Sequence, residues 1–367
     1  MPGPTRGPDP SGGAVIDPQA GAPPPAELAT GDESLPLARA LELHRLVVRT
    51  RVMEERCIKM SKSGEAFFWV GGPGEEAFNV CLGLQVRRGF GPAFDYLHLH
   101  YRNPGLMLAM GMPVLDHVRQ MAMARTDAHS MGRNFVCHYA KRDWNVIPVT
   151  SVVEVQYAMA PGTALVQKRS GGEGVSIVIG GEAGTAEGDF ATCMIWSTRP
   201  SHELPVLMVI TNNHYGISTA HESQHAEKRI IDRGQAFGIP GEVIDGNDVV
   251  ASWHAVRRAM AYCRSQRRPY MLEARVSRLH GHSSSSGAAR VEGEADCLYQ
   301  LERRLVAAGV ERHELEQVHA EAKTEVEAAV QQAVNEPKPT AADVLRYTYA
   351  PSPVDVVYPE DYTGLPN

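Results

Sequence analysis

The sequence "GGEAGTAEGDF", residues 180–190, directly follows the apolar run "VSIVI" at residues 175–179. A short apolar run that ends in glycine is typical of a buried strand. The glycines permit a tight turn, and a helix that starts after the turn would point its free N–H groups toward the end of the strand. The stretch therefore predicts a strand, a turn that carries the carboxylate of Glu182, and the start of a helix.

The same alternation of strand and helix recurs along the chain. The stretches "LPVLMVITNN" (204–213), "GEVIDGND" (241–248) and "YMLEARVSRL" (270–279) each read as a strand, and residues 249–266 read as an amphipathic helix. Such alternation is typical of an α/β fold with a mainly parallel sheet flanked by helices, whose ligands lie beyond the carboxyl ends of the strands. We therefore expect an α/β fold.

The two ends of the chain differ from this central part. Residues 1–33 are rich in proline, glycine and alanine, and we expect them to be a disordered lead. The apolar spacing from Leu35 to about Lys62 predicts a long helix before the first strand. Residues 296–335 read as two further helical segments that break near Gly309. We expect one domain over residues 34–336.

The last part of the chain, residues 337–367, is rich in proline. We interpret it as a C-terminal tail that wraps on the surface of a partner.

Composition excludes several classes of function. A chain of 367 residues with 43% hydrophobic residues can bury a substantial core. The net charge of −7 argues against a nucleic-acid partner, because it offers no broad cationic face to phosphates. No apolar stretch approaches the roughly 20 residues that span a bilayer, so we expect no membrane association. The six cysteines lack CxxC spacing, which indicates reduced thiols and a cytoplasmic protein.

Oxygen-bearing side chains follow two of the predicted strands. Glu182 comes after the strand that ends near residue 179, and Asn212 and Asn213 end the next one. Carboxylate, amide and main-chain oxygens are the ligands that Mg²⁺ takes while it shares its shell with phosphates. The helix N–H groups after Ala183 would bind those phosphates.

This arrangement resembles the fingerprint of thiamine-diphosphate enzymes, which opens on Gly-Asp-Gly or Gly-Glu-Gly and closes on Asn-Asn about thirty residues later. Here Gly181-Glu182-Ala183 opens the pattern and Asn212-Asn213 closes it. Six further motifs occur in the same order as in one family: "HYRNPG" (100–105), "GRNFVCHYA" (132–140), "EGDF" (187–190), "NNHYGIST" (212–219), "RGQAFGIPGEVIDGNDV" (233–249) and "RLHGHS" (278–283). From about residue 36 to 345, the chain thus resembles the α subunit of the E1 component of a 2-oxoacid dehydrogenase complex.

The resemblance implies a thiamine-diphosphate-binding fold with thiamine diphosphate and Mg²⁺ as cofactors, and it assigns a role to each matching residue. The expected Mg²⁺ ligands are the side chains of Glu182 and Asn213 and the main-chain carbonyl of Tyr215. His282 is the expected catalytic residue, facing the phosphates and the reacting centre. The remaining expected contacts to the cofactor are Tyr101 and Arg102 at the diphosphate, Ser151 and the main chain of Val153 at the pyrimidine, and Gly181, Ala183 and Gly184 in the turn.

The reaction that the resemblance implies is decarboxylation of a 2-oxoacid, followed by reductive acylation of the lipoyl group of an E2 component. In this family a β subunit supplies the glutamate that activates the cofactor, so the chain should act only within an α₂β₂ heterotetramer. Glu182, and "EGDF" followed by "GIST", favour a branched-chain substrate, whereas "HGHS" is closer to the pyruvate enzymes. A pyruvate or acetoin dehydrogenase E1 α subunit therefore stays open.

Several positions depart from the family pattern. Ala183 adds a methyl group where the backbone approaches the diphosphate, and Thr211 stands where an arginine often binds phosphate. The loop "HSSSSGAARVEGEAD" (282–296) is shorter than in the family, and we interpret its serines as a flexible linker. These departures keep a second hypothesis open, a non-catalytic subunit that serves assembly. An NAD-dependent dehydrogenase is excluded, because no GxGxxG follows a predicted strand in the required register.

Overall fold

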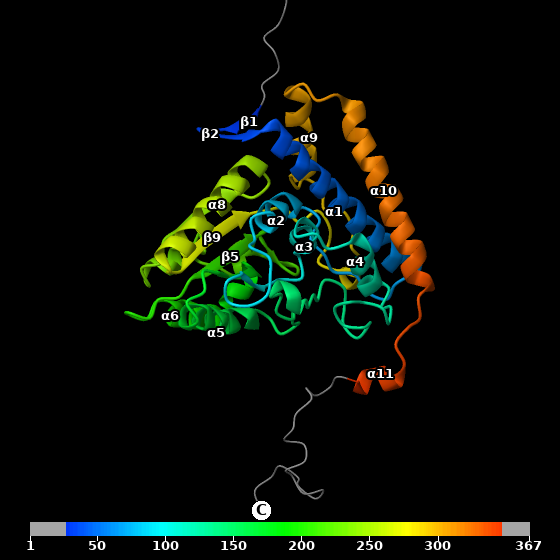
Figure 1. The fold of residues 1–367 in the computed structure, drawn as a ribbon. Helices are drawn as coiled ribbons and strands as arrows, with labels where there is room; N and C mark the ends of the chain where they lie inside the picture. The colour runs from blue at the N-terminus through cyan, green and yellow to red at the C-terminus, as the bar shows by residue number, and fades with distance from the viewer. Residues whose placement is uncertain (1–26, 347–367) are drawn as a thin grey trace, which may run out of the picture.

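The computed structural model describes residues 27–346, and a five-stranded sheet forms its centre (Figure 1). All neighbouring strands in this sheet run parallel, which confirms the predicted α/β class. The strand order is β3 (Tyr96–His98), β4 (Ser176–Gly181), β5 (Val206–Asn212), β9 (Tyr270–Arg275) and β8 (Gly241–Asp245).

Strands β4 and β5 are buried almost throughout because helices cover both faces of the sheet. Val178 and Met208 point into a cluster with residues of α5 (Val155–Arg169) and α6 (Gly188–Ser197). Ile177, Ile179, Leu207 and Val209 point to the other face and pack with residues of α2 (Glu76–Gly83) and α8 (Val249–Gln266). Burial on both faces explains why these strands are continuous apolar runs.

The register of β4 and β5 fixes the edge at which both strands end. Gly181 pairs with Thr211, so that Glu182 and Asn213 each leave the sheet within two residues of the same pair. On the other side of β5, Asn212 pairs with Arg275 at the end of β9. The carboxyl ends of three strands therefore meet at one edge, as expected for a ligand site in a parallel sheet.

The N-terminal part differs from the sequence prediction. The predicted long helix is confirmed as α1 (Leu37–Ser63), but residues 27–33 belong to an antiparallel hairpin of β1 (Glu27–Thr30) and β2 (Glu33–Pro36), not to a disordered lead. The physical reason is tertiary, because the hairpin buries Leu28 and Leu35 against residues of α1 and α8. The rest of the predicted lead, residues 1–26, lies outside the described residues.

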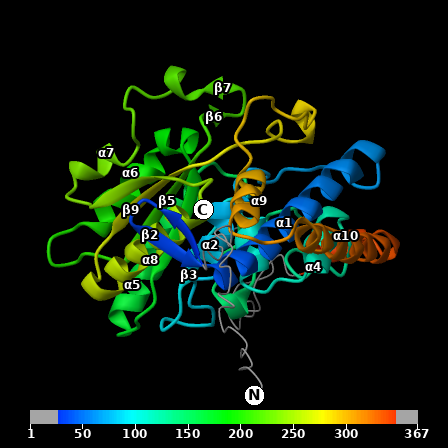
Figure 2. The same ribbon diagram turned by 90° about the horizontal axis from the view of Figure 1, so that it is seen from above.

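The C-terminal helices agree with the prediction. α9 (Cys297–Ala307) and α10 (Arg312–Asn335) are separated by a turn at Gly309, which has a positive φ of 91°. α10 lies along α1 and reaches α4 (Val114–Met121), as both views show (Figure 2).

The first part of the predicted tail packs on this chain. The carbonyl of Pro337 accepts a hydrogen bond of 2.8 Å from the amide of Arg125. The Nζ of Lys338 donates to the carbonyl of Ala122 at 2.5 Å. The short helix α11 (Ala341–Leu345) follows, and the rest of the tail, residues 347–367, lies outside the described residues.

The six cysteines all lie in the part of the chain that the structure describes. All six cysteines are buried and free, as predicted. No helix between residues 27 and 346 is long and apolar enough to cross a bilayer. The remaining helices and strands are α3 (Pro104–Ala109), α7 (Asp232–Gln235), β6 (Tyr215–Gly216), β7 (Thr219–Ala220) and the 3₁₀ turns η1 (Arg142–Trp144), η2 (Ala183–Ala186), η3 (His221–Ser223) and η4 (Ser284–Ser286).

Asp248 connects the hairpin to two helices, so a substitution at this position tests how the N-terminal part is held. Its Oδ1 caps α8 by accepting from the amide of Val250 at 2.8 Å, and also accepts from Arg304 at 2.8 Å. Its Oδ2 accepts from Thr30 Oγ1 at 2.7 Å. We expect Asp248→Ala to lower the free energy of unfolding by about 2 kcal/mol, measured by urea denaturation.

The matched control is Asp248→Asn, which keeps an amide oxygen for the helix cap but loses the charge that pairs with Arg304. We expect it to lose about half as much stability as the alanine variant. Equal losses in the two variants would contradict a role for the cap.

Candidate active site

A cavity of about 470 Å³ lies at the edge where the parallel strands end. Its lining comes from separate segments of the chain that the fold brings together. It includes every residue to which the resemblance assigns a role: Tyr101, Arg102, Ser151, Val153, Gly181, Glu182, Ala183, Gly184, Asn213, Tyr215 and His282. The structure therefore places all of these residues around one space, and their individual roles toward a cofactor remain predictions.

Glu182 is almost completely buried at the start of the turn after β4, with 1% of its surface exposed. The backbone amide of Asn213 donates to its Oε2 at 3.3 Å, although 31 positions separate the two residues. Its Oε1 is buried without a hydrogen-bond partner within residues 27–346, and burial raises the pKa of this carboxyl group. An unpaired buried carboxylate oxygen is costly, so the site fits a cation that would neutralise it.

Asn213 is held from two sides. Its Nδ2 donates to Oε1 of Glu75 at 3.3 Å, and its Oδ1 accepts from the amide of Tyr215 at 3.2 Å. Glu75 is itself buried, and burial raises its pKa to about 7. Glu75 is not among the residues that the sequence predicts at the site. The sequence feature that could have identified it is the acid pair Glu75-Glu76, which directly follows a glycine turn.

Glu154 is a second acid that the sequence analysis missed. It lines the cavity at the N-terminus of α5, with a positive φ of 58°. Its Oε1 accepts from the amide of Gly181 at 3.2 Å, and burial raises its pKa to about 8. A Cβ at Gly184 would lie 2.1 Å from Cγ of Glu154, so the turn can pass this side chain only as glycine. A lone acid within an apolar stretch gives no sequence signal for this contact.

Two guanidinium groups lie near the acids. Arg102 is buried, donates through Nη1 to the carbonyl of Gly71, and has its Nε 3.9 Å from Oε1 of Glu75. Arg278 lies 5.1 Å from the ring of Tyr215, and two of its nitrogens are buried without a partner in the described chain. Arg278 lies inside the motif "RLHGHS", yet the sequence analysis did not single it out. Unpaired buried guanidinium nitrogens fit an anion such as a diphosphate.

His282 faces Arg102 across the cavity. Nη2 of Arg102 lies 3.1 Å from Nδ1 of His282, and because a guanidinium can only donate, Nδ1 must accept. Burial lowers the pKa of His282 to about 4, and the charges of Arg102 and Arg278 act in the same direction. At neutral pH the ring is therefore neutral and carries its proton on Nε2, which can donate to a bound group.

Ser151 is also bonded inside the cavity wall. Its Oγ lies 2.8 Å from Nε2 of His138, the histidine of the motif "GRNFVCHYA". Burial lowers the pKa of His138. This hydrogen bond fixes the hydroxyl that the resemblance assigns to the pyrimidine.

The structure explains how the chain accommodates Ala183. A Cβ at Gly216 would lie 2.6 Å from the methyl group of Ala183. The glycine at 216 thus leaves the space that the extra methyl group occupies.

The serine run is an ordered turn, and the prediction of a flexible linker is wrong. Ser283 and Ser286 cap the 3₁₀ turn η4 reciprocally. The Oγ of Ser284 accepts from the amide of Trp69 at 3.0 Å, and the amide of Ser284 donates to the carbonyl of Trp69 at 2.8 Å. The loop is anchored by this distant segment, which the sequence pattern of serines does not reveal.

The fold and the cavity place the chain in the class of α/β proteins that bind their ligand at the carboxyl ends of parallel strands. The chain belongs to the dehydrogenase E1 component family, whose sequence model matches residues 44–342. This family depends on thiamine diphosphate.

Similar proteins are α subunits of E1 components, which confirms the resemblance. The chain is 29% identical over 320 residues to 2-oxoisovalerate dehydrogenase subunit alpha of Bacillus subtilis (strain 168), covering 85% of this chain and 95% of that protein. It is 27% identical over 251 residues to the mitochondrial 2-oxoisovalerate dehydrogenase subunit alpha 2 of Arabidopsis thaliana, covering 68% and 52%. It is 25% identical over 324 residues to the pyruvate dehydrogenase E1 component subunit alpha of Staphylococcus aureus (strain Mu50 / ATCC 700699), covering 85% and 83%.

The protonation state of His282 can be measured directly. In the chain without cofactor, we expect its ring to titrate with a midpoint near pH 4, because burial and two guanidinium groups disfavour the charged form. NMR of chain labelled in histidine follows this midpoint, and the signal that disappears in His282→Gln assigns it.

A variant tests the electrostatic part of this explanation. Arg278→Gln removes one of the two positive charges and should move the midpoint of His282 upward. A midpoint near the ordinary value of about 6.5 in the unmodified chain would show that the ring is solvated and does not face Arg102.

Proposed function

We propose that the chain is the α subunit of a thiamine-diphosphate-dependent E1 component that decarboxylates a branched-chain 2-oxoacid and passes the acyl group to the lipoyl domain of E2. One observation carries this proposal. The carboxylate of Glu182 and the backbone of Asn213 meet at the ends of neighbouring strands, with one carboxylate oxygen buried and unpaired.

The residues around the cavity fit Mg²⁺ and a diphosphate. Glu182, the Asn213 side chain and the Tyr215 carbonyl offer oxygen ligands. Arg102 in the lining, and Arg278 beside the ring of Tyr215, offer charge-assisted hydrogen bonds. Thiamine diphosphate would supply the electron sink that decarboxylation of a 2-oxoacid requires. The chain itself binds and orients this group, and His282 holds a proton at Nε2 that can stabilise negative charge as it develops.

The cavity wall supports an aliphatic substrate. Phe68 and Phe135 line the cavity with their ring centroids 4.8 Å apart, and Leu99 and Val149 add further apolar surface. Apolar walls exclude water and accept a branched side chain. The names of two similar proteins refer to 2-oxoisovalerate, and the similar pyruvate dehydrogenase subunit keeps pyruvate as the second candidate substrate.

The surroundings of the cavity support a β subunit as partner in an α₂β₂ assembly. Val152, Val153 and Ile217 line the cavity although each is more than half exposed to solvent in the single chain. Exposed apolar side chains at the rim of a site are typical of a surface that another subunit covers. We place this assembly in the cytoplasm, where a reducing environment keeps thiols such as the six buried cysteines free.

Cofactor binding tests the proposed metal ligand. In the co-purified α/β pair, we expect Glu182→Gln to weaken binding of thiamine diphosphate in the presence of Mg²⁺ by roughly 100-fold, because a neutral amide no longer offsets the charge of the ion. Isothermal titration measures this loss.

The matched control is Glu187→Gln, an exposed acid in the same stretch whose side chain makes no capping hydrogen bond. It should bind cofactor like the unmodified pair. No saturable heat from the unmodified pair would favour the assembly role instead.

Carbon dioxide release ranks the substrates. We expect the α/β pair with thiamine diphosphate and Mg²⁺ to release CO₂ faster from 3-methyl-2-oxobutanoate than from pyruvate, and the α chain alone to release none. A higher rate with pyruvate would replace the proposed substrate, and equal, negligible release from both would count against an enzymatic role.

A further inference from the structure

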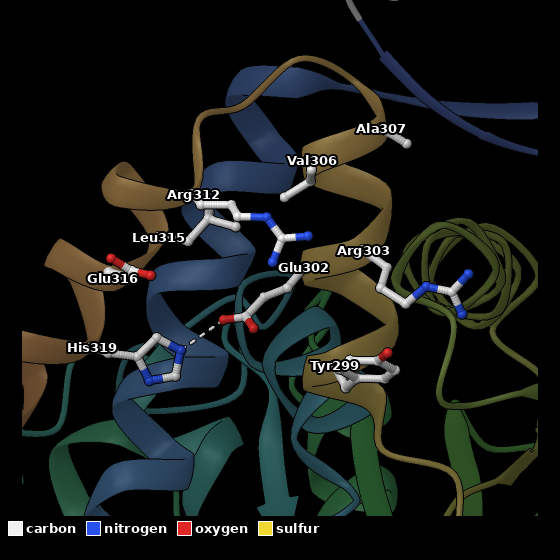
Figure 3. Close-up of a pocket in the computed structure, with 9 residues that line it drawn as sticks. All are labelled: Tyr299, Glu302, Arg303, Val306, Ala307, Arg312, Leu315, Glu316 and His319. Atoms are coloured by element: carbon white, nitrogen blue, oxygen red, sulfur yellow. Dashed lines mark hydrogen bonds and ion pairs between the residues drawn. The ribbon is translucent and has the colours of Figure 1, made fainter.

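Three potential metal ligands meet at the junction of α1, α9 and α10. The residues are His44 on α1, Glu302 on α9 and His319 on α10, which lie far from the motifs around the cofactor cavity in sequence. Oε1 of Glu302 lies 3.0 Å from Nε2 of His44 and 2.7 Å from Nε2 of His319, as the close-up shows for the second pair (Figure 3). The three ligand atoms lie within 4.8 Å of one another.

The burial and charge of the cluster favour a cation. His44 is fully buried, and its Nε2 is the nitrogen that faces Oε1 of Glu302. Oε1 of Glu302 lies within hydrogen-bond distance of both imidazoles. One carboxylate oxygen of Glu302 is thus shared by two imidazoles, and it is the hydrogen-bond partner of the buried His44 ring.

An ion can reach this cluster from solvent. Glu302 and His319 line a cavity of about 490 Å³ beside α9 and α10, whose lining also includes Tyr299, Arg303 and Arg312. Figure 3 shows Glu302 pointing from α9 toward His319 on α10. His319 is 39% exposed, so its ring can adjust when a ligand enters. An entry path and a movable ligand are what a binding site for an exchangeable ion requires.

A second group of potential ligands lacks these properties. Glu54, His117 and Cys137 also lie close together, but all three are buried. Oε2 of Glu54 already accepts from Nε1 of Trp69 and from the amide of Gly72, both at 3.2 Å. Its other oxygen, Oε1, lies 3.3 Å from Nε2 of His117 with both side chains fully buried. The cluster on α1, α9 and α10 is the better candidate because two of its members line a cavity that opens to solvent.

We propose that His44, Glu302 and His319 bind a first-row transition-metal dication, with Zn²⁺ as the best fit. Zn²⁺ takes imidazole nitrogen and carboxylate oxygen at about 2 Å in tetrahedral geometry, which puts neighbouring ligand atoms about 3.3 Å apart. The two nitrogen-to-oxygen distances of 3.0 and 2.7 Å need only a small opening to match this spacing. A water molecule from the cavity completes the four ligands.

The nitrogen ligands distinguish this site from the one proposed for the cofactor. Mg²⁺ prefers oxygen ligands and keeps several waters, whereas imidazole suits Zn²⁺ and Co²⁺. An ion between the three helices would tie α9 and α10 to α1. The proposal is therefore independent of the enzymatic function and concerns how the C-terminal helices are held.

Cobalt provides a direct test. The α/β pair, stripped with a chelator and dialysed into excess Mg²⁺, is titrated with Co²⁺ while the visible absorption of tetrahedral Co²⁺ is recorded. We expect one equivalent per α chain and its displacement by Zn²⁺. His319→Ala should weaken binding at least 30-fold, and His313→Ala, an exposed histidine on the same helix, should leave it unchanged.

Further measurements keep the outcome unambiguous. Zn²⁺ should raise the melting temperature of the unmodified pair and of His313→Ala, but not of His319→Ala or Glu302→Gln. Cofactor binding, measured in the same samples, should be equal in all four proteins, which confirms their folding and separates this result from the proposed function. Absence of the tetrahedral band, or an equal band in His319→Ala, would overturn the proposal and leave a hydrogen-bonded network only.

Discussion

The parallel pairing of β4 with β5 is the constraint on which the rest of the site depends. Because Gly181 lies opposite Thr211, the first residues beyond the two strands are neighbours in space, and Glu182 accepts a hydrogen bond from the backbone of Asn213. Parallel strands need a crossover, which α6 provides, so both strands end at the same edge. A shift of the register by one residue would turn the buried side chains of β5 to the opposite face and remove this contact.

The electrostatic character of the cavity follows from what this edge buries. Glu75, Glu154 and Glu182 are three acids with raised pKa values, and each owes the rise chiefly to burial. Arg102 and Arg278 bring positive charge to the same region. A divalent cation linked to a diphosphate carries both signs of charge, and it would compensate both groups together. The unpaired oxygens and nitrogens of these side chains are thus complementary to a single ligand that contains both a cation and an anion.

Helix α1 connects this site to the outer helices. Arg51 pairs with Glu76 of α2 at 2.5 Å and with Asp296 before α9 at 2.9 Å, and it is buried between them. One turn further along α1, Glu54 holds the amide of Gly72 in the glycine turn before α2. His44, earlier on the same helix, meets α9 and α10. A single helix therefore anchors both the wall of the cofactor cavity and the C-terminal helical pair.

Sequence patterns are sufficient to predict the strand, turn and helix around Glu182, the partner strand that ends at Asn213, and the order of motifs that identifies the family. These signals are local, because a strand end and a tight turn are written in consecutive residues. Only the tertiary structure placed Glu154 beneath the turn and Arg278 over Tyr215, since neither contact joins neighbouring residues. The hairpin at residues 27–36 and the anchored serine turn were decided in the same way. Each is held by burial or hydrogen bonds to distant segments, which outweigh a local composition that favours disorder.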